Sequence, residues 1–225
     1  MSRTQPITRV NLEFVSFAQE LSQLLPANLP HRDDCIAGAA RHLELILEAN
    51  RHFNLTRIVN PREAAIKHVL DSVLPWHLFE GAKHIADAGS GTGFPGIPLA
   101  LVMPKTRFTL LESTLKKAAF LATAIETLAL PHVEPVAERA EAYLAIHPVD
   151  VITARAVAPL SRAIPLFAPA LRKGARVLLY KGPDAGNEII EARRDPKNGR
   201  WNIRVVFEYD LPDSLGSRRI IELTA

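Results

Sequence analysis

Cysteine is nearly absent from this 225-residue sequence: Cys35 stands alone, which excludes a disulfide bond within the chain and fits a reducing compartment. The N-terminus lacks the charged segment and apolar core of a secretory signal. Long hydrophobic runs are missing too, because the most apolar stretch, residues 94–102, is short and contains two prolines. We therefore expect a cytoplasmic protein without a membrane-spanning segment. The histidines show no metal-ligand spacing, so we predict no metal site.

A strong excess of either charge is also lacking, with 27 Lys and Arg against 24 Asp and Glu and a net charge of +3. The charge is nevertheless unevenly spread. Residues 1–80 hold 8 basic and 9 acidic residues, whereas residues 172–219 hold 11 basic and 7 acidic ones. A basic C-terminal half suits a polyanionic partner, although a solvated surface would have the same composition.

Three helices are predicted before residue 81. Apolar residues at helical spacing indicate the first over Asn11–Leu25. Acidic residues suited to a helix N-terminus mark the start of a second near Asp33. The third begins at Asn60-Pro61, with the asparagine as N-cap, the proline in the first turn and Glu63 in the capping-box position. We treat residues 1–80 as an N-terminal helical extension.

From residue 81 to residue 225, short apolar strands alternate with helical stretches, which predicts an α/β domain with a doubly wound, mostly parallel sheet. The last two strands have no helix between them and can pair only as an antiparallel hairpin at the sheet edge. We therefore expect a Rossmann-like sheet of seven strands. The predicted strands are His84–Ala88, Arg107–Leu111, Val133–Val136, Val149–Thr153, Arg176–Tyr180, Asn202–Tyr209 and Arg218–Leu223. The predicted helices are Pro95–Val102, Thr114–Leu128, Ala137–Tyr143, Leu160–Leu171 and Asp184–Arg194.

The first of these strands runs into a turn with glycine at every second position, Gly89, Gly91 and Gly93, and a helix follows. Glycine adopts positive φ readily and lets a ligand approach the backbone, and ligands bind at such strand ends in doubly wound sheets. Two cofactor classes compete for this turn, dinucleotides and the methyl donor S-adenosylmethionine. A dinucleotide matches the formal pattern Gly91-x-Gly93-x-x-Gly96, with Glu112 about 20 residues further on. A purely structural glycine loop is the third possibility.

Asp87, just before the first glycine, favours the methyl donor S-adenosylmethionine over a dinucleotide. Its carboxylate would repel a pyrophosphate, whereas it can attract the ammonium group of the methionine part, directly or through water. Glu112, at the end of the next strand, would accept hydrogen bonds from the ribose hydroxyls of either cofactor.

The chain resembles a known family over residues 50–182. The matching pieces, in family order, are Asn54-Leu55-Thr56, His68-Val69-Leu70-Asp71-Ser72, residues 89–100, Leu110-Leu111-Glu112-Ser113, Lys116-Lys117, Phe120-Leu121, Arg139-Ala140-Glu141, Ala154-Arg155-Ala156 and Lys181-Gly182. They are similar to the family once called glucose-inhibited division protein B, whose members are 16S ribosomal RNA guanine-N7 methyltransferases with the class I methyltransferase fold. One departure is Tyr180, which stands where a smaller residue is usual.

The resemblance implies roles for single residues. The cofactor site would contain Gly89, Gly91, Phe94, Glu112, Ala140, Glu141 and Arg155, with Ala140 and Glu141 at the adenine end. The substrate would be positioned by Arg155, Asn54, His68, Asp71 and Lys181. Arg155, after the fourth strand, presents a planar donor fork that suits a phosphate or guanine O6.

Each substrate residue also has a structural interpretation. Arg155 could pair with a carboxylate, and Lys181 could be an ordinary surface lysine. His68 and Asp71, three residues apart on one helix face, could brace that helix against the sheet. Asn54 is a residue type common after helix ends.

The residues that are missing argue for guanine N7 as the target atom. Methylation at pyrimidine C5 usually needs a cysteine nucleophile, and we expect Cys35 to be a buried packing residue on an N-terminal helix. Exocyclic amines typically need an Asn/Asp-Pro-Pro-aromatic motif after the fourth strand, where this chain has residues 153–156 instead. Guanine N7 carries a lone pair and no proton, so it needs neither a nucleophile nor a general base.

The sequence thus predicts an S-adenosylmethionine-dependent methyltransferase that acts on 16S rRNA or the small ribosomal subunit. Because N7 lies in the deep groove of an RNA duplex, the target base is expected to be unpaired. The alternatives are a methyltransferase of the same fold with a small-molecule or protein substrate, and a nucleotide-binding regulator without catalysis. No oligomer is implied.

Overall fold

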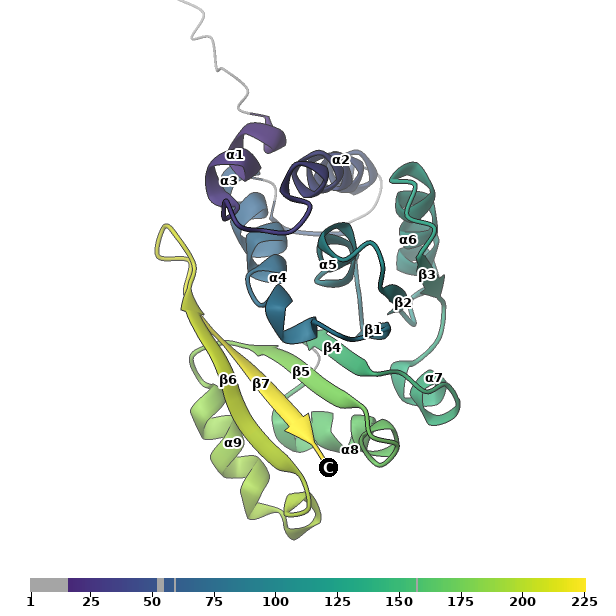
Figure 1. Cartoon of the computed structure of the whole chain (residues 1–225), viewed down its shortest axis with the longest axis vertical. Coiled ribbons are helices and arrows are strands. Elements are labelled where there is room, and N and C mark those ends of the chain that lie inside the picture. The colour runs from purple at the N-terminus through teal and green to yellow at the C-terminus, as the bar shows by residue number, and fades with distance from the viewer. Residues whose placement is uncertain (1–15, 52–54, 59, 157) are drawn as a thin grey trace, which may run out of the picture.

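The computed structural model describes residues 16–51, 55–58, 60–156 and 158–225. In this part of the chain, strands form one sheet in the order β3-β2-β1-β4-β5-β7-β6 (Figure 1). The bounds are β1 (His84–Ala88), β2 (Arg107–Leu111), β3 (Val133–Val136), β4 (Val151–Arg155), β5 (Arg176–Lys181), β6 (Asn202–Asp210) and β7 (Ser217–Thr224). Strands β1 to β5 run parallel, and β7 pairs antiparallel with both β5 and β6. The predicted doubly wound sheet with its C-terminal hairpin is confirmed.

Helices cover both faces of this sheet (Figure 1). One hydrophobic core joins the sheet to the N-terminal helices, α5 and α6, and a second joins it to α7, α8 and α9. Neighbouring strand residues alternate between the cores, so that Ile85 faces the first and Ala86 the second. The helices are α1 (Phe17–Leu24), α2 (Arg32–Asn50), α3 (Pro61–Ala64), α4 (Asp71–Val73), α5 (Gly96–Val102), α6 (Leu115–Thr127), α7 (Ala140–Ile146), α8 (Leu160–Leu171) and α9 (Ala185–Arg194). The shorter elements are the π-helical segment η1 (Ala65–Leu70) and the 3₁₀ turns η2 (Trp76–Phe79) and η3 (Pro196–Asn198).

The first helix is described only from its cap onward. Ser16 is the N-cap of α1 and forms a capping box with Gln19 in the first turn of the helix. Residues 11–15, which the sequence assigns to the same helix, lie outside the described residues. The second helix, α2, begins close to the predicted Asp33.

The third predicted helix begins where the sequence places it. The side chain of Asn60 accepts the N–H of Glu63 at 3.0 Å, and Pro61 occupies the first turn. The carboxylate of Glu63 binds Lys67 at 2.7 Å. The π-helical segment η1, which carries His68, is not predicted from the sequence.

Strand β4 lies two residues further along the chain than predicted. The sequence predicts Val149–Thr153, but the strand spans Val151–Arg155. Asp150 is instead part of the turn before the strand, where its carboxylate accepts the N–H of Lys83 at 2.7 Å. Arg155 is therefore the last residue of β4 and does not follow the strand.

Helix α7 begins three residues later than predicted. Arg139 has an extended backbone, with φ −68° and ψ 134°, so the predicted helix Ala137–Tyr143 forms as Ala140–Ile146. Ala140 and Glu141 consequently lie in the first helical turn, next to the carboxyl end of the sheet.

Candidate functional site

The chain changes its winding direction between β1 and β4. After β3 it crosses to the other side of β1 to form β4, so the loops that follow β1 and β4 lead away from each other. In doubly wound sheets such a switch point opens a crevice outside the carboxyl ends of the strands, and ligands bind there. Gly89 follows β1 and Arg155 ends β4, so both lie at this crevice.

The turn after β1 has the backbone conformation that its glycines predict. Gly89, Gly91 and Gly93 have φ values of 74°, 59° and 99°, which other residues rarely adopt. The N–H groups of Gly89 and Ser90 both donate to the carbonyl of Leu111, at 2.8 and 3.0 Å. The turn is therefore fixed to the end of β2 by its own backbone.

Asp87 supports this turn from within the protein. Its side chain is completely buried, and its Oδ2 accepts the N–H of Gly96 at 2.9 Å. A Cβ at Gly96 would lie 2.3 Å from Cδ2 of Leu110, so this close approach requires glycine. Burial raises the pKa of Asp87 to about 6. The carboxylate has no exposed surface, so the expected direct contact with an ammonium group is not available in this geometry.

Glu112 connects the glycine turn to the segment before α6. Its Oε2 accepts the N–H of Gly91 at 3.1 Å, and its Oε1 accepts the N–H of Thr114 at 2.7 Å. Each carboxylate oxygen keeps a second lone pair, and the side chain lines the smaller of two hollows at the crevice. Glu112 therefore retains the acceptor capacity that the ribose role requires.

This smaller hollow has a volume of about 270 Å³. The residues predicted for the cofactor that line it are Gly89, Glu112, Ala140 and Glu141. Small-molecule sites usually measure about 300–1,000 Å³, so a hollow of this size suits one end of a ligand. Of the other residues predicted for the cofactor, Gly91, Phe94 and Arg155 do not line it. Gly91 acts through its hydrogen bond to Glu112, and Arg155 lines a second hollow.

A larger hollow of about 960 Å³ shares one lining residue with the smaller one, Leu166 on α8. Its charged lining residues are Lys67, Asp71, Arg155, Arg162, Lys181, Glu188 and Arg218. Five cations against two carboxylates make it positively charged. It brings together all the predicted substrate residues except Asn54, which lies outside the described residues.

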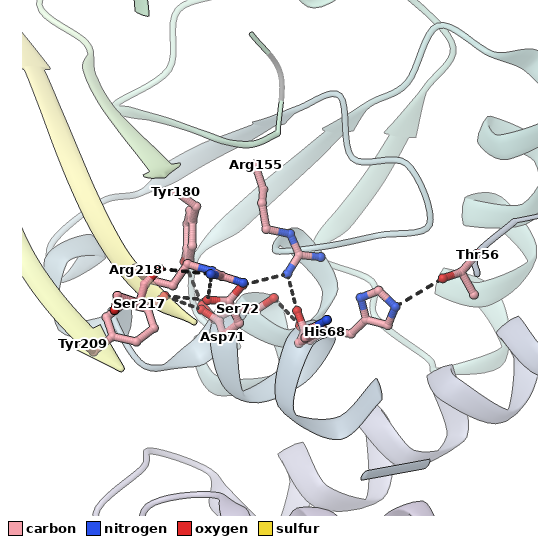
Figure 2. Close-up of polar contacts among 10 residues, drawn as sticks. Thr56, His68, Asp71, Ser72, Arg155, Tyr180, Tyr209, Ser217 and Arg218 are labelled. Carbon is pink, nitrogen blue, oxygen red and sulfur yellow. Dashed lines mark hydrogen bonds and ion pairs between the residues drawn. The ribbon is translucent and has the colours of Figure 1, made fainter. Parts of the chain in front are cut away.

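Asp71 lies at the centre of a buried ionic cluster beside the larger hollow (Figure 2). Its side chain is 1% exposed, and its carboxylate pairs with Arg155 of β4 at 3.3 Å and with Arg218 of β7 at 3.2 Å. The hydroxyl of Tyr209 donates to it at 2.9 Å. Burial and the negative charge of Asp71 raise the pKa of Tyr209, which keeps this donor protonated. Protein donors occupy the carboxylate, so this geometry supports the structural interpretation of Asp71.

Arg155 commits only part of its guanidinium to these contacts. Its Nη1 donates to the carbonyl of Lys67 at 2.7 Å as well as to Asp71, and the side chain is 19% exposed. Its Nε and Nη2 make no hydrogen bond with any described residue. Arg155 therefore combines the carboxylate pairing, drawn in Figure 2, with a free donor edge, and the residue lines the larger hollow.

Phe94 packs against His68 and Arg155, two residues that line the larger hollow. Its buried ring stacks on His68 with 4.6 Å between centroids, and the guanidinium carbon of Arg155 lies 5.5 Å from the ring centroid. On α2, His42 lies 4.8 Å from the same ring and donates its Nε2–H to the carbonyl of Thr92 at 2.8 Å. Burial lowers the pKa of His42 to about 4 and that of His68 to about 3, so both rings are neutral at pH 7.

Lys181 forms a nearly buried ion pair in the wall of the larger hollow. Its side chain is 11% exposed, and its Nζ donates to Glu188 at 2.8 Å and to the carbonyl of Ala158. Glu188 also accepts the N–H of Leu160 at 2.9 Å and thereby joins β5 to α8 and α9. Lys181 is therefore neither an ordinary surface lysine nor a cation without a counter-charge.

Several site residues carry no signal in the sequence. Tyr209 lies 138 residues after Asp71, and no local pattern indicates that the C-terminal hairpin returns to that carboxylate. His42 is one polar residue on an otherwise apolar helix face. Tyr180 is visible only as a departure from the family pattern, and its hydroxyl donates to the carbonyl of Ser72 at 2.7 Å, which ties β5 to α4.

Cys35 is completely buried on α2, as predicted, and burial raises the pKa of its thiol to about 12, which makes it unsuitable as a nucleophile. Among the described residues, no group of His, Cys, Asp and Glu could hold a metal ion. In the same part of the chain, no helix has both the length and the apolar character needed to cross a bilayer.

Comparison with known proteins adds the deciding observation. Residues 36–206 match the family model described as rRNA small subunit methyltransferase G. The chain belongs to this family. The rRNA small subunit methyltransferase G of Solibacter usitatus is 64% identical over 209 residues, which are 93% of this chain and 100% of that protein. The one from Carboxydothermus hydrogenoformans is 34% identical over 187 residues, 80% of this chain and 79% of that protein.

Membership of the rRNA small subunit methyltransferase G family confirms the resemblance seen in the sequence and the predicted enzyme class. It also decides between the two cofactor classes considered for the glycine-rich turn, in favour of S-adenosylmethionine. The fold agrees. The O-methyltransferase TomG from Streptomyces achromogenes, solved in complex with SAM, superposes with a TM-score of 0.55 at 20% identity, over 82% of this chain and 90% of that chain. The predicted class I methyltransferase fold is thereby confirmed.

Proposed function

We propose that this chain transfers a methyl group from S-adenosylmethionine to N7 of a guanosine in the 16S rRNA of the small ribosomal subunit. The observation that carries the proposal is that two unlike hollows lie on either side of a shared lining residue, Leu166. The smaller is bordered by glycine backbone and carboxylates, which suit a nucleoside. The larger is cationic, and its carboxylates are already bound by protein donors.

The smaller hollow has residues suited to the cofactor. When bound, S-adenosylmethionine supplies an electrophilic methyl group on a sulfonium centre. Glu112 would accept from the ribose hydroxyls, and Ala140 and Glu141 would border the adenine. Gly89 would let the methionine part lie against the backbone. Below the turn, the buried Oδ1 of Asp87 has no hydrogen-bond partner among the described residues, and its negative charge favours a cationic ligand.

The larger hollow suits N7 as the target atom. Asp71 and Glu188 are both held by protein cations, and an imidazole with a pKa as low as that of His68 is a poor base at pH 7. A lone pair without a proton needs no base, so positioning can supply the acceleration, up to ~7–11 kcal/mol. The open edge of Arg155 suits guanine O6, which lies beside N7 on the same edge of the base.

The charge of the larger hollow suits an RNA substrate. Arg162 at the start of α8 is exposed, and Arg218 lines the same hollow from β7. Both can contact phosphates, and affinity that depends on such contacts falls steeply with salt. Guanine N7 in duplex RNA lies in a groove that side chains cannot read, so the target base must be unpaired or splayed out of its stack.

We further propose that residues 1–80 are a helical extension of a cofactor-binding domain formed by residues 81–225. The lining of the smaller hollow comes from the second part alone. The extension contributes Lys67, His68 and Asp71 to the larger hollow, where the substrate would bind. A ribosomal substrate would place the protein in the cytoplasm.

Methyl transfer from a labelled donor to small-subunit rRNA that lacks the modification tests the function, with naked rRNA and assembled subunits as parallel substrates. The expected product is label in one guanosine, which mass spectrometry of nuclease fragments identifies as N7-methylguanosine. Label on an exocyclic amine or on ribose would overturn the assignment of the target atom. Turnover with a protein or small molecule in the absence of RNA would overturn the substrate, and donor binding without any transfer would indicate a regulator.

A further inference from the structure

A third hollow lies on α8, away from the crevice. Its volume is about 200 Å³, and it shares no lining residue with the two hollows described above. Helix α8 and its C-cap contribute Ile164, Pro165, Ala168 and Arg172, and the segment between α9 and β6 contributes Lys197, Asn198, Arg200 and Trp201.

Lys197 and Arg200 lie in a segment that is held in place by contacts other than those of their own side chains. Asp195 accepts the N–H of Lys197 at 2.9 Å, and the buried side chain of Asn198 donates to a carbonyl of α9 at 3.0 Å. The N–H of Trp201 donates to the carbonyl of Asn198 at 3.0 Å. The side chains of Lys197 and Arg200 are therefore not needed to hold this segment in place.

Three cations line this hollow without an ion pair. Arg172, Lys197 and Arg200 are exposed, and none of them forms an ion pair with a described residue. No Asp or Glu is among the described residues that line the hollow. Arg107, by contrast, is an exposed arginine that pairs with Glu134 at 2.9 Å. Three like charges around one small hollow repel each other, so their arrangement favours a bound anion.

The hollow suits a backbone phosphate better than a base. It is smaller than the ~300–1,000 Å³ of most small-molecule sites. Trp201, the aromatic side chain on which a base could stack, is buried, and the guanidinium carbon of Arg200 lies 5.5 Å from its ring centroid. Exposed Arg and Lys side chains contact the phosphate oxygens that repeat along any strand, whatever the base sequence.

The position of the hollow suits an RNA that also occupies the larger hollow. Arg162 lies in the first turn of α8 and lines the larger hollow, whereas Arg172 caps the other end of the same helix. At a rise of about 1.5 Å per residue, the two arginines are separated by about 15 Å along the helix axis. At about 100° per residue, the two side chains also lie about 80° apart around the axis. A short segment of RNA that follows the surface of α8 can contact both.

We propose that this third hollow is a second contact for the rRNA backbone, which holds the substrate and takes no part in methyl transfer. The proposal rests on the proposed rRNA substrate but not on which base is methylated.

The triple variant Arg172→Gln/Lys197→Gln/Arg200→Gln tests this contact. We expect the KM for small-subunit rRNA to rise roughly tenfold, with kcat at saturating rRNA and the heat of S-adenosylmethionine binding unchanged. The slope of log K for rRNA against log salt should decrease in magnitude by about 2–3, because each lost phosphate contact removes ~0.7–0.9.

The matched control is Arg51→Gln/Lys83→Gln/Lys105→Gln. It removes the same charge from exposed residues that line none of the three hollows. Its KM and salt slope should change much less than those of the first variant. Equal effects of the two variants would mean that only net charge matters, and they would overturn the proposal. A defect on assembled subunits with naked rRNA binding unchanged would assign the hollow to a ribosomal protein and would also overturn it.

Two further measurements keep the test decisive. If circular dichroism shows that the triple variant does not fold, Arg200→Gln alone must still lower the salt slope by about 1, and an unchanged slope sinks the proposal. If the wild-type protein transfers no methyl group to rRNA, the proposed function fails, but direct rRNA binding by wild type and variant still tests the contact.

Discussion

The carboxylate of Asp71 and the guanidinium of Arg155 meet at 3.3 Å across the junction between the N-terminal helices and the sheet. Arg218 reaches the same carboxylate from the C-terminal hairpin. Asp71 therefore joins three parts of the chain that are distant in sequence. The pairing turns one nitrogen of Arg155 towards the protein and leaves its other donors for the larger hollow.

Asp71→Asn should lower the free energy of unfolding by roughly 3–5 kcal/mol, because it leaves two largely buried guanidinium groups without their counter-charge. Urea titrations at constant pH measure this change. Glu134→Gln is the control, since it breaks an exposed pair whose loss should cost about 0–1 kcal/mol. If the two variants lose the same amount, the cluster around Asp71 does not have the stabilising role described here.

Arg155→Lys should lower kcat/KM for rRNA by about 10- to 100-fold, because lysine keeps the charge but loses the planar donor fork. The affinity for S-adenosylmethionine should change little, since Arg155 lines the larger hollow and not the smaller one. Steady-state kinetics and calorimetry separate the two effects. Normal kcat/KM in a folded variant would show that the open edge of Arg155 does not meet the substrate.

Gly89→Val should abolish binding of S-adenosylmethionine and leave the fold largely intact. Valine is strained at a φ of 74°, and its side chain would project where the cofactor approaches the backbone. Gly81→Val is the matched control, because Gly81 has a φ of 81° and open space around it, away from the crevice. Calorimetry should detect binding to the control variant only. Equal binding by both variants would move the cofactor away from this turn.

Lowering the pH should reduce the free energy of unfolding, because His68 is buried as a neutral imidazole. Burial, reinforced by Arg155, lowers its pKa from 6.5 to about 3, so the unfolded chain takes up a proton that the folded protein resists. The stabilisation present above pH 6.5 is lost as the pH falls towards 3, by up to ~1.4 kcal/mol per pH unit. Asp87 acts in the opposite direction, because burial raises its pKa from 3.8 to about 6, and its protonation in that range favours the folded state.

The variant His68→Phe isolates the histidine contribution, since phenylalanine can keep the stacking on Phe94. Its free energy of unfolding should fall less steeply than that of the wild type between pH 6.5 and 4.5. Parallel urea titrations at several pH values give both slopes. Identical slopes would contradict the low pKa assigned to His68.

Local patterns were sufficient for the central sheet and for one half of the site. The sequence predicts β1, β2 and β3 with their observed bounds, because short apolar strands alternate there with helical stretches. A parallel sheet then brings the carboxyl ends of its strands to one edge, which places Gly89 and Glu112 together at the smaller hollow. Strand β4 is less well predicted, because Asp150 ends the preceding turn through a contact with Lys83, the residue before β1, which lies 67 residues away in sequence.

The other half of the site depends on contacts that no local pattern encodes. The larger hollow has walls from the N-terminal helices, the strand ends and the hairpin. The sequence indicates that Asp71 and Arg155 matter, but their pairing depends on how the helices dock on the sheet. Which residues of the hairpin return to Asp71 follows from the register of β7 on β5, and a one-residue slip of register would turn Arg218 to the opposite face.

Because the hairpin contacts Asp71 at the larger hollow, the two hollows depend differently on the hairpin. In the sheet, β7 is three strands away from β1, and the glycine turn is fastened to β2 on the far side. Loss of the hairpin contact would therefore remove part of the wall of the larger hollow, whereas no residue of β6 or β7 lines the smaller one. We expect a protein with damage confined to the last two strands to bind S-adenosylmethionine but to transfer no methyl group to rRNA.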